Sequence, residues 1–200
     1  SMHLPSPDSK WTTLVQLLTL IGTILQKQRD GMGMLEINET GSHFFESKAT
    51  SEWIKLMLSH LSKKEGESKK NANIAFEIEA LMSKIPRRSQ VILFIDLFQE
   101  NLEEILDAAA LLAFEGHSVR CIFMSHAKLE LNEEYFAGKQ VVDSETGAKA
   151  YINQNDAKRY VSFVEAQKEC AITLSRNLNL NCKVLDASRE PMYLLRELLA

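Results

Sequence analysis

The sequence contains little cysteine, proline or glycine: 3, 4 and 8 residues, respectively, among 200. The scarcity of cysteine and the lack of a CxxC pair exclude a disulfide-stapled scaffold and the common zinc and redox motifs. The low proline and glycine content excludes collagen and long disordered tracts. No apolar run approaches the roughly 18 residues that a membrane span needs, and no signal peptide is evident. We therefore expect a globular, cytoplasmic protein in which Cys121 and Cys182 are reduced thiols facing the core.

An excess of basic residues is also missing, because 23 Lys and Arg side chains stand against 27 Asp and Glu, for a net charge of −4. Proteins that bind nucleic acid usually carry a basic excess or a basic stripe, since neutralising phosphates supplies much of their affinity. The basic clusters here, such as Arg87-Arg88, alternate with acidic residues and are typical of solvated helix ends and loops. Nucleic acid is therefore disfavoured as a partner.

The hydrophobic residues, 45% of the chain, follow alternating helical and strand periods. Between residues 10 and 28 they recur at the spacing of an amphipathic helix, with Asp8 or Ser9 as its N-cap and Gly31 as its left-handed stop. The uninterrupted apolar run Val91–Ile95 is typical of a strand covered on both faces. In all, the sequence predicts helices at Lys10–Gln28, Thr50–Leu61, Ile74–Ile85, Leu102–Phe114, about Asp156–Asn177 and from Pro191 onward; strands at Met32–Ile37, His43–Glu46, Val91–Ile95, Val119–Met124 and Cys182–Leu185; a β-hairpin within residues 140–152; and a polar loop at Ser62–Lys70.

This order of elements predicts a single α/β domain over residues 1–200, with a doubly wound, mostly parallel sheet between two layers of helices. No internal repeat or linker divides the chain. The nucleotide-binding patterns GxxxxGK[ST] and GxGxxG do not occur, and neither does the GxSxG nucleophile motif. The five histidines lack the spacing of metal ligands, so we interpret each as a surface or turn residue.

One acidic residue stands out by its position. Asp96 follows the apolar run Val91–Ile95 directly, which predicts a place at the carboxyl edge of a central strand, where open α/β sheets bind ligands. A carboxylate there can coordinate a hard cation such as Mg²⁺. The alternative is purely structural: Asp96 caps the helix that starts near Asn101 or accepts hydrogen bonds from loop amides.

Several segments around Asp96 occur in a recognisable order. Asp96 lies in the stretch Val91–Phe98, with sequence VILFIDLF. The other segments are Arg29–Met34, Phe114–Val119, Leu129–Leu131, Asp143–Gly147, Arg159-Tyr160 and the closing stretch Asp186–Leu199. In this order and spacing, over roughly residues 11–200, they resemble the von Willebrand factor A-like family labelled domain of unknown function 58.

The resemblance implies a von Willebrand A-type fold. Members of this family are commonly encoded beside MoxR-type AAA+ ATPases and are thought to act in protein assembly or maturation, and no enzymatic activity is attached to the family. It also implies a degenerate metal-ion-dependent adhesion site. Asp96 matches the aspartate of that site, whereas the threonine position falls near Asn71–Asn73. The acidic DPxE sequence of relatives is replaced by Ser125-His126-Ala127-Lys128.

The first motif of that metal site, DxSxS on the first strand, is not found in the sequence. Ser1-Met2 is either a tag remnant before a natural methionine or the tail of a truncated DxSxSM, in which case Ser1 would be a metal ligand. Under this comparison the first, central strand of the family is missing from residues 1–200, which leaves a slot beside Val91–Ile95.

The leading hypothesis is thus a non-enzymatic interaction domain that binds a MoxR-type AAA+ ATPase or a client protein around Asp96, with Mg²⁺ bridging to a partner carboxylate if the site is competent. Two alternatives remain open. One is an Mg²⁺-dependent phosphoester hydrolase that uses Asp96, although a DxDx[TV] motif does not occur. The other is a structural scaffold without any metal. The sequence does not indicate an oligomeric state.

Overall fold

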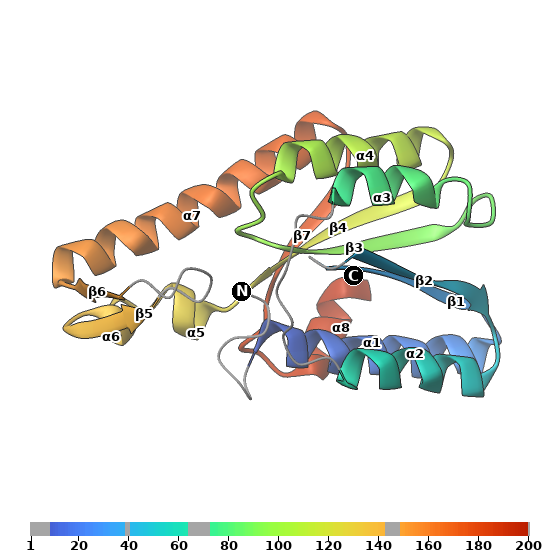
Figure 1. The fold of residues 1–200 in the computed structure, drawn as a ribbon, viewed down its shortest axis with the longest axis horizontal. Helices are drawn as coiled ribbons and strands as arrows, with labels where there is room; N and C mark the ends of the chain where they lie inside the picture. The colour runs from blue at the N-terminus through green and yellow to red at the C-terminus, as the bar shows by residue number, and fades with distance from the viewer. Residues whose placement is uncertain (1–8, 39–40, 64–72, 143–148, 200) are drawn as a thin grey trace.

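The protein is described from a computed structural model that covers residues 9–38, 41–63, 73–142 and 149–199. Its centre is a parallel sheet in the order β3-β4-β7, formed by β3 (Gln90–Asp96), β4 (Ser118–Ser125) and β7 (Asn181–Asp186). Helices cover both faces, so the mixed α/β architecture expected from the alternating pattern is confirmed at that level (Figure 1). Among the described strands, β3 pairs only with β4 and therefore lies at an edge of this sheet.

The helices lie on the two faces of the sheet as two groups (Figure 1). The first group consists of α3 (Ile74–Leu81), α4 (Leu102–Phe114) and α7 (Gln154–Asn177), and the second of α1 (Lys10–Gln28), α2 (Ser51–Lys63) and α8 (Pro191–Leu199). Two short helices, α5 (Ala127–Glu130) and α6 (Glu133–Phe136), follow β4. They are too short to produce a periodic pattern, which is why the sequence did not predict them.

Two antiparallel ribbons accompany the parallel sheet. The predicted strands at Met32–Ile37 and His43–Glu46 are found as β1 (Met32–Asn38) and β2 (Gly41–Lys48), which pair with each other. The predicted hairpin within 140–152 is confirmed by β5 (Lys139–Val142) paired with β6 (Lys149–Ile152). Its Asp143–Gly147 turn lies outside the described residues. The β5–β6 ribbon projects away from the main sheet (Figure 1).

The first helix is capped largely as its sequence predicts. Ser9 is the N-cap, since its Oγ accepts a hydrogen bond from the Thr12 N–H at 3.1 Å. The helix stops at Arg29-Asp30-Gly31 as predicted, but the left-handed residue is Arg29, with φ 61°, and not Gly31. The Arg29 N–H donates to the Gln26 carbonyl, and the Asp30 N–H donates to the Leu25 carbonyl. These bonds give partners to two carbonyls of the last helical turn.

Other boundaries differ from the prediction by a few residues. α3 ends at Leu81, four residues before the predicted Ile85. α7 begins at Gln154, two residues early, because Asn153 forms a capping box with Asp156. α2 continues to Lys63, and the rest of the polar loop predicted at Ser62–Lys70 lies outside the described residues.

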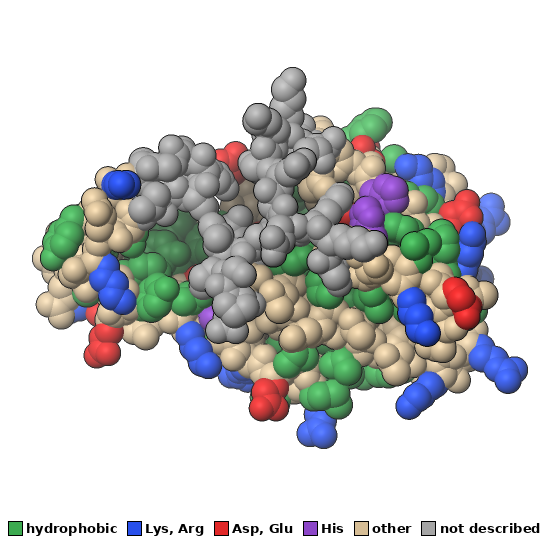
Figure 2. All heavy atoms as spheres, turned by 60° about the horizontal axis from the view of Figure 1, so that its bottom comes forward, with side chains coloured by type: hydrophobic (Ala, Val, Ile, Leu, Met, Phe, Trp, Pro, Cys, Tyr) green, Lys and Arg blue, Asp and Glu red, His purple; other side chains and the backbone are tan. Residues whose placement is uncertain are grey.

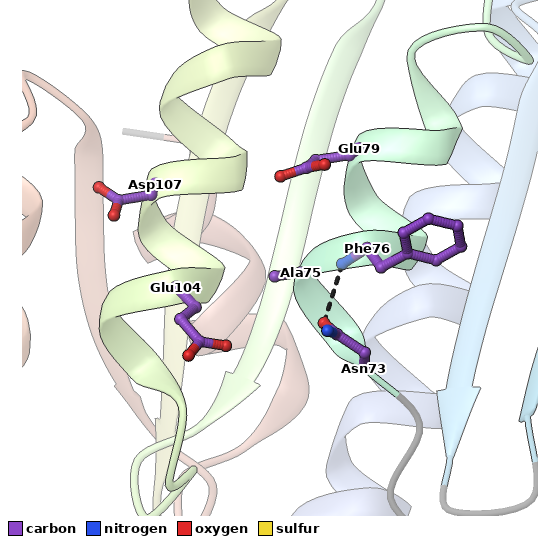
Figure 3. Close-up of a pocket in the computed structure, with 6 residues that line it drawn as sticks. All are labelled: Asn73, Ala75, Phe76, Glu79, Glu104 and Asp107. Atoms are coloured by element: carbon purple, nitrogen blue, oxygen red, sulfur yellow. Dashed lines mark hydrogen bonds between the residues drawn. The ribbon is translucent and has the colours of Figure 1, made fainter.

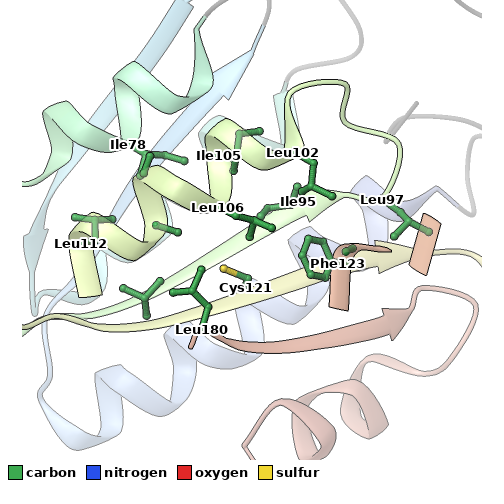
Figure 4. Close-up of a cluster of buried hydrophobic side chains, with 14 of the residues drawn as sticks. Ile78, Ile95, Leu97, Leu102, Ile105, Leu106, Leu112, Cys121, Phe123 and Leu180 are labelled. Atoms are coloured by element: carbon green, nitrogen blue, oxygen red, sulfur yellow. The ribbon is translucent and has the colours of Figure 1, made fainter. Parts of the chain in front are cut away.

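The core is divided by the sheet. On one face, side chains of β3 and β4 pack against α3, α4 and α7, with Phe123 and Leu106 completely buried (Figure 4). On the other face, Ile122 and Leu185 pack against α1 and α8. The parallel strands are covered by helices on both faces, as their apolar runs predict.

Candidate functional site

Asp96 lies at the carboxyl end of a parallel strand, as expected, but the expectation of a central strand is wrong, because among the described strands β3 pairs only with β4 and lies at the side of the sheet. Asp96 is the last residue of β3 and is opposite Met124 in the parallel register with β4. In the next pair of strands, Ser125 is opposite Asp186. Because the strands are parallel, these residues and the loops that follow them share the carboxyl edge of the sheet. This edge is the candidate site.

Lys10, the first residue of α1, reaches into this edge. Its Nζ lies 2.9 Å from Asp96 Oδ1 and 2.8 Å from Oε1 of Glu130, which comes from α5. The lysine residue is only 3% exposed, and each carboxylate side chain is 9% exposed. A buried ammonium is therefore held between two buried carboxylates. The sequence around any one of these three residues does not predict this arrangement.

Electrostatics keep this lysine charged. Burial by itself would lower the pKa of Lys10, but the charges of Asp96 and Glu130 and their hydrogen bonds outweigh burial and raise it above 10.5. The ring of Phe98 lies 5.4 Å from Nζ and adds a cation–π contact. Burial, followed by the negative charges of Glu130 and Asp96, raises the pKa of nearby Tyr160 to about 12, so this phenol keeps its proton.

Both carboxylates also accept hydrogen bonds from backbone amides. Asp96 Oδ1 accepts from the Phe98 N–H at 3.2 Å, so the loop-amide contact named in the structural alternative is present. Glu130 Oε2 accepts from the His126 N–H at 2.8 Å.

These residues do not fit a divalent cation at Asp96. The space between the two carboxylates is taken by the Lys10 ammonium, and no group of three or more His, Cys, Asp or Glu side chains in the described ranges could hold a metal. Asn73 caps α3 by accepting from the Phe76 N–H at 3.0 Å. Ser1 and Asn71, the other suggested positions, lie outside the described residues.

A third carboxylate of the edge, Asp186, stabilises the loops around it. It accepts hydrogen bonds from the Ala127 N–H at 2.9 Å, the Ser188 N–H at 3.0 Å and the Ser188 hydroxyl at 2.9 Å. Burial alone would raise the pKa of Asp186, but these hydrogen bonds together with the charge of His126 hold it below 3.8. The side chain therefore remains ionised at neutral pH and joins the end of β7 to the start of α5.

His126 lies in the turn between β4 and α5, which agrees with the predicted surface or turn position, but it is not at the surface. It is 5% exposed, and its Nδ1 has no hydrogen-bond partner among the described residues. His117 is buried as well, and its Nδ1 accepts a hydrogen bond from the Ser89 N–H at 3.3 Å. Isolated histidines give no periodic signal, so only packing decides that these two are inside.

The hydrogen bonds of Asp186 predict that stability depends on pH in the acid range. Because its pKa is lower in the folded state than the unfolded value near 3.8, its stabilisation is present above about pH 4 and is lost as the pH falls through the folded value. We expect Asp186→Asn to lower the unfolding free energy by about 1 kcal/mol at pH 7, with a gap that closes towards pH 3. Urea titrations at pH 7, 5 and 3 measure this. The exposed Asp107→Asn is the control, and a gap that stays constant down to pH 3 contradicts the assignment.

Outside this edge, a shallow groove lies between α3 and α4 (Figure 3). Glu79 points from α3 towards α4, whereas Asp107 points away from α3 and the ring of Phe76 points away from the groove. The acidic side chains of this groove therefore do not converge on one point, and the groove is not a metal site.

All three cysteines are free thiols in the structure. Cys121 is fully buried and pairs in register with the half-buried Cys182 on the neighbouring strand. Burial, with a smaller contribution from Cys182, raises the pKa of the Cys121 thiol to about 12. A thiol that stays protonated is a poor nucleophile, so we interpret Cys121 as a core residue.

Sequence reasoning missed Lys10 and Glu130, although one local signal exists. Lys10 stands in the first turn of a helix that has no acidic residue there, and a cation at a helix N-terminus is unfavourable unless a carboxylate neutralises it. This signal indicates that a partner is needed, but it does not identify Asp96, which lies 86 residues away.

Fold and edge together define a mixed α/β domain with a buried lysine between two carboxylates at the carboxyl end of a parallel sheet. The chain belongs to the family described as protein of unknown function DUF58, whose model matches residues 5–171. The resemblance inferred from the motifs is thereby confirmed at the level of this family. A comparison with curated proteins found no significant match.

Two solved structures share the fold. One is the conserved hypothetical protein BatB from Bacteroides thetaiotaomicron, at 12% identity and a TM-score of 0.57, with 97% of this chain and 88% of that chain covered. The other is an aerotolerance-related membrane protein from Bacteroides fragilis NCTC 9343 with multiple mutations to serines, at 11% identity and a TM-score of 0.53, covering 96% and 88%. At such identities the similarity shows the fold alone. Among the described residues of this chain, no helix is both long and apolar enough to cross a membrane.

Proposed function

We propose that this protein is a non-enzymatic, cytoplasmic interaction domain of von Willebrand A type, which binds a MoxR-type AAA+ ATPase or one of its client proteins at the carboxyl edge of the sheet. Membership of the DUF58 family and the three-layer arrangement around a parallel sheet support the fold assignment. The partner class follows from the family resemblance, and the edge is chosen because open α/β sheets place their binding sites there.

The observation that carries the proposal is a group of exposed aromatic side chains beside this edge. The projecting segment, residues 133–142 and 149–163, extends beyond the sheet (Figure 1). It exposes Tyr135, Tyr151 and Phe163, of which Tyr151 is 69% exposed. Phe163 also stacks on Phe98, which connects the segment to the residues around Lys10. Exposed aromatic residues of this kind are enriched at protein interfaces.

The charges of the surface agree with a protein partner. Among the described residues on the face drawn in Figure 2, Lys and Arg side chains are interspersed with Asp and Glu and form no broad patch of one sign. Such a surface favours protein partners over nucleic acid, because nucleic-acid binding needs a concentrated positive field.

The hydrolase alternative has one observation in its favour, since Lys10 and Glu130 stand beside Asp96 as such an enzyme would require. The same contacts oppose it. A nucleophilic carboxylate has to be reached by its substrate, whereas the Asp96 side chain is 9% exposed and is already ion-paired with Lys10. We expect no Asp96-dependent turnover of generic phosphoesters with Mg²⁺ or Mn²⁺. Robust turnover that is lost in Asp96→Asn would establish the hydrolase instead.

The proposal is tested by measuring the affinity of the purified protein for a MoxR-type ATPase from the same organism, with and without ATP. We expect Tyr151→Ala to weaken binding at least tenfold, because truncating a central aromatic residue of an interface commonly costs more than 1.4 kcal/mol. The matched control is Phe114→Ala. Phe114 is 85% exposed and ends α4 just before β4, so it lies at the opposite edge of the sheet.

The control should bind like the wild type. Equal losses in both variants would remove the carboxyl edge as the interface. No binding at tens of micromolar protein in either nucleotide state would remove the ATPase as the partner.

A further inference from the structure

The positive charge at the carboxyl edge of the sheet is the ammonium group of Lys10. Lys10 Nζ is within 2.9 Å of one carboxylate and 2.8 Å of another, and the residue is almost completely buried. We infer that the Lys10 ammonium is a tethered replacement for a bound divalent cation between Asp96 and Glu130, and that removing it converts the pair into a divalent-cation site. This inference concerns the site itself and does not depend on the proposed partner.

The two carboxylates do not rely on Lys10 for their positions. The Phe98 N–H holds Asp96 and the His126 N–H holds Glu130, and both amides belong to loops that follow the strands of the sheet. The anionic cradle is therefore preorganised by the backbone. It should persist when the lysine is shortened, because these hydrogen bonds remain.

The charge balance favours a divalent ion once the ammonium is gone. Two ionised carboxylates then share a buried place with a charge of −2, which is unfavourable unless a cation or protons neutralise it. Ca²⁺ and Mg²⁺ take oxygen ligands at about 2.0–2.6 Å and complete their shells with water.

The wild type is expected to behave differently. The Lys10 ammonium already donates to both carboxylates, so a divalent ion would have to displace a charge that is attached to α1. Because the lysine is part of the chain, its effective concentration at the site is high, and millimolar free cation does not compete with it. The edge is therefore independent of divalent cations in the wild type.

The test compares thermal unfolding and calorimetric titration of the wild type and Lys10→Ala with CaCl₂ and MgCl₂. We expect no shift for the wild type with either cation or with a chelator. Lys10→Ala should melt at a lower temperature and should recover about 4 °C when Ca²⁺ or Mg²⁺ reaches ten times its dissociation constant. The double variant Lys10→Ala/Asp96→Asn is the matched control, which should bind neither cation.

Two results overturn the inference: saturable, Asp96-dependent cation binding by the wild type, or a folded Lys10→Ala protein that binds no divalent cation. If Lys10→Ala does not fold in buffer alone, it is refolded with and without 5–10 mM Ca²⁺. Recovery only with Ca²⁺ supports the inference. If Lys10→Ala fails to refold in both conditions while Lys10→Ala/Asp96→Asn/Glu130→Gln folds, the inference is contradicted. The repulsion between the two carboxylates would then prevent folding, and a divalent cation would not relieve that repulsion.

Discussion

Lys10→Met is expected to lower the free energy of unfolding by about 3–5 kcal/mol, the range observed when one partner of a buried ion pair is removed. Methionine retains most of the aliphatic volume of lysine, so the loss reports the charge more than the packing. Without the ammonium, the carboxylates of Asp96 and Glu130 lie close together in a buried site. Their repulsion is relieved only if the side chains move apart or bind protons. Urea titrations at pH 7 measure the loss.

Two controls separate this effect from a general weakening of α1. Lys27→Met, at the exposed end of the same helix, should cost less than about 1 kcal/mol. The triple variant Lys10→Met/Asp96→Asn/Glu130→Gln removes all three charges and should regain most of the lost stability. If the triple variant is no more stable than Lys10→Met, the buried ion pairs are not the cause of the loss.

The same ion pairs determine a pH dependence. Because the pKa of Lys10 is raised above 10.5 in the folded state, its stabilisation is complete below about pH 10.5 and is lost as the pH rises through the folded value. The difference in stability between the wild type and Lys10→Met should therefore stay constant from pH 7 to 9 and shrink above pH 10.5.

Phe123→Ala is expected to cost about 3–5 kcal/mol, the usual range for removing a buried aromatic side chain. Phe123 lies in the middle strand β4, is completely buried, and belongs to the cluster that α4 and α7 cover (Figure 4). Both neighbouring strands limit how far the backbone can collapse into the cavity, so the cost should fall in the upper part of that range. The denaturation midpoint should shift while the slope stays nearly unchanged.

A phenylalanine at the surface supplies the control for this prediction. Phe114 is 85% exposed at the end of α4, and Phe114→Ala should change stability by no more than about 0.5 kcal/mol. Comparable losses in the two variants would contradict the assignment of Phe123 to a closely packed core.

Local patterns in the sequence predicted most of the elements correctly. The helix at Lys10–Gln28 and the helix at Leu102–Phe114 have the bounds that their periodicity indicated. The five-residue apolar run before Asp96 predicted a parallel strand correctly, although only Ile95 of this run is fully buried. These features depend on residues within a few positions of one another, so that spacing and capping chemistry suffice to identify them.

Local patterns failed where a short segment or a backbone angle was decided by packing. The two helices α5 and α6 carry too few residues for a period, and Arg29 instead of Gly31 takes the left-handed conformation. The prediction that residues 1–200 form one domain without its first strand is not tested by the described residues. The von Willebrand A assignment likewise remains part of the proposal, because neighbours at 11–12% identity show the fold alone.

The candidate site divides in the same way. Asp96 could be predicted because the end of an apolar strand is visible in the sequence. Its partners could not, since Lys10 lies 86 residues earlier in the chain and Glu130 belongs to a four-residue helix. Only the packing of α1 and α5 against the carboxyl edge brings the three charges together. An ion pair is a property of distance in space, and the chain carries no periodic signal for it; thus the sequence identified an acid that can bind a cation, and the tertiary structure decided that the cation is a lysine.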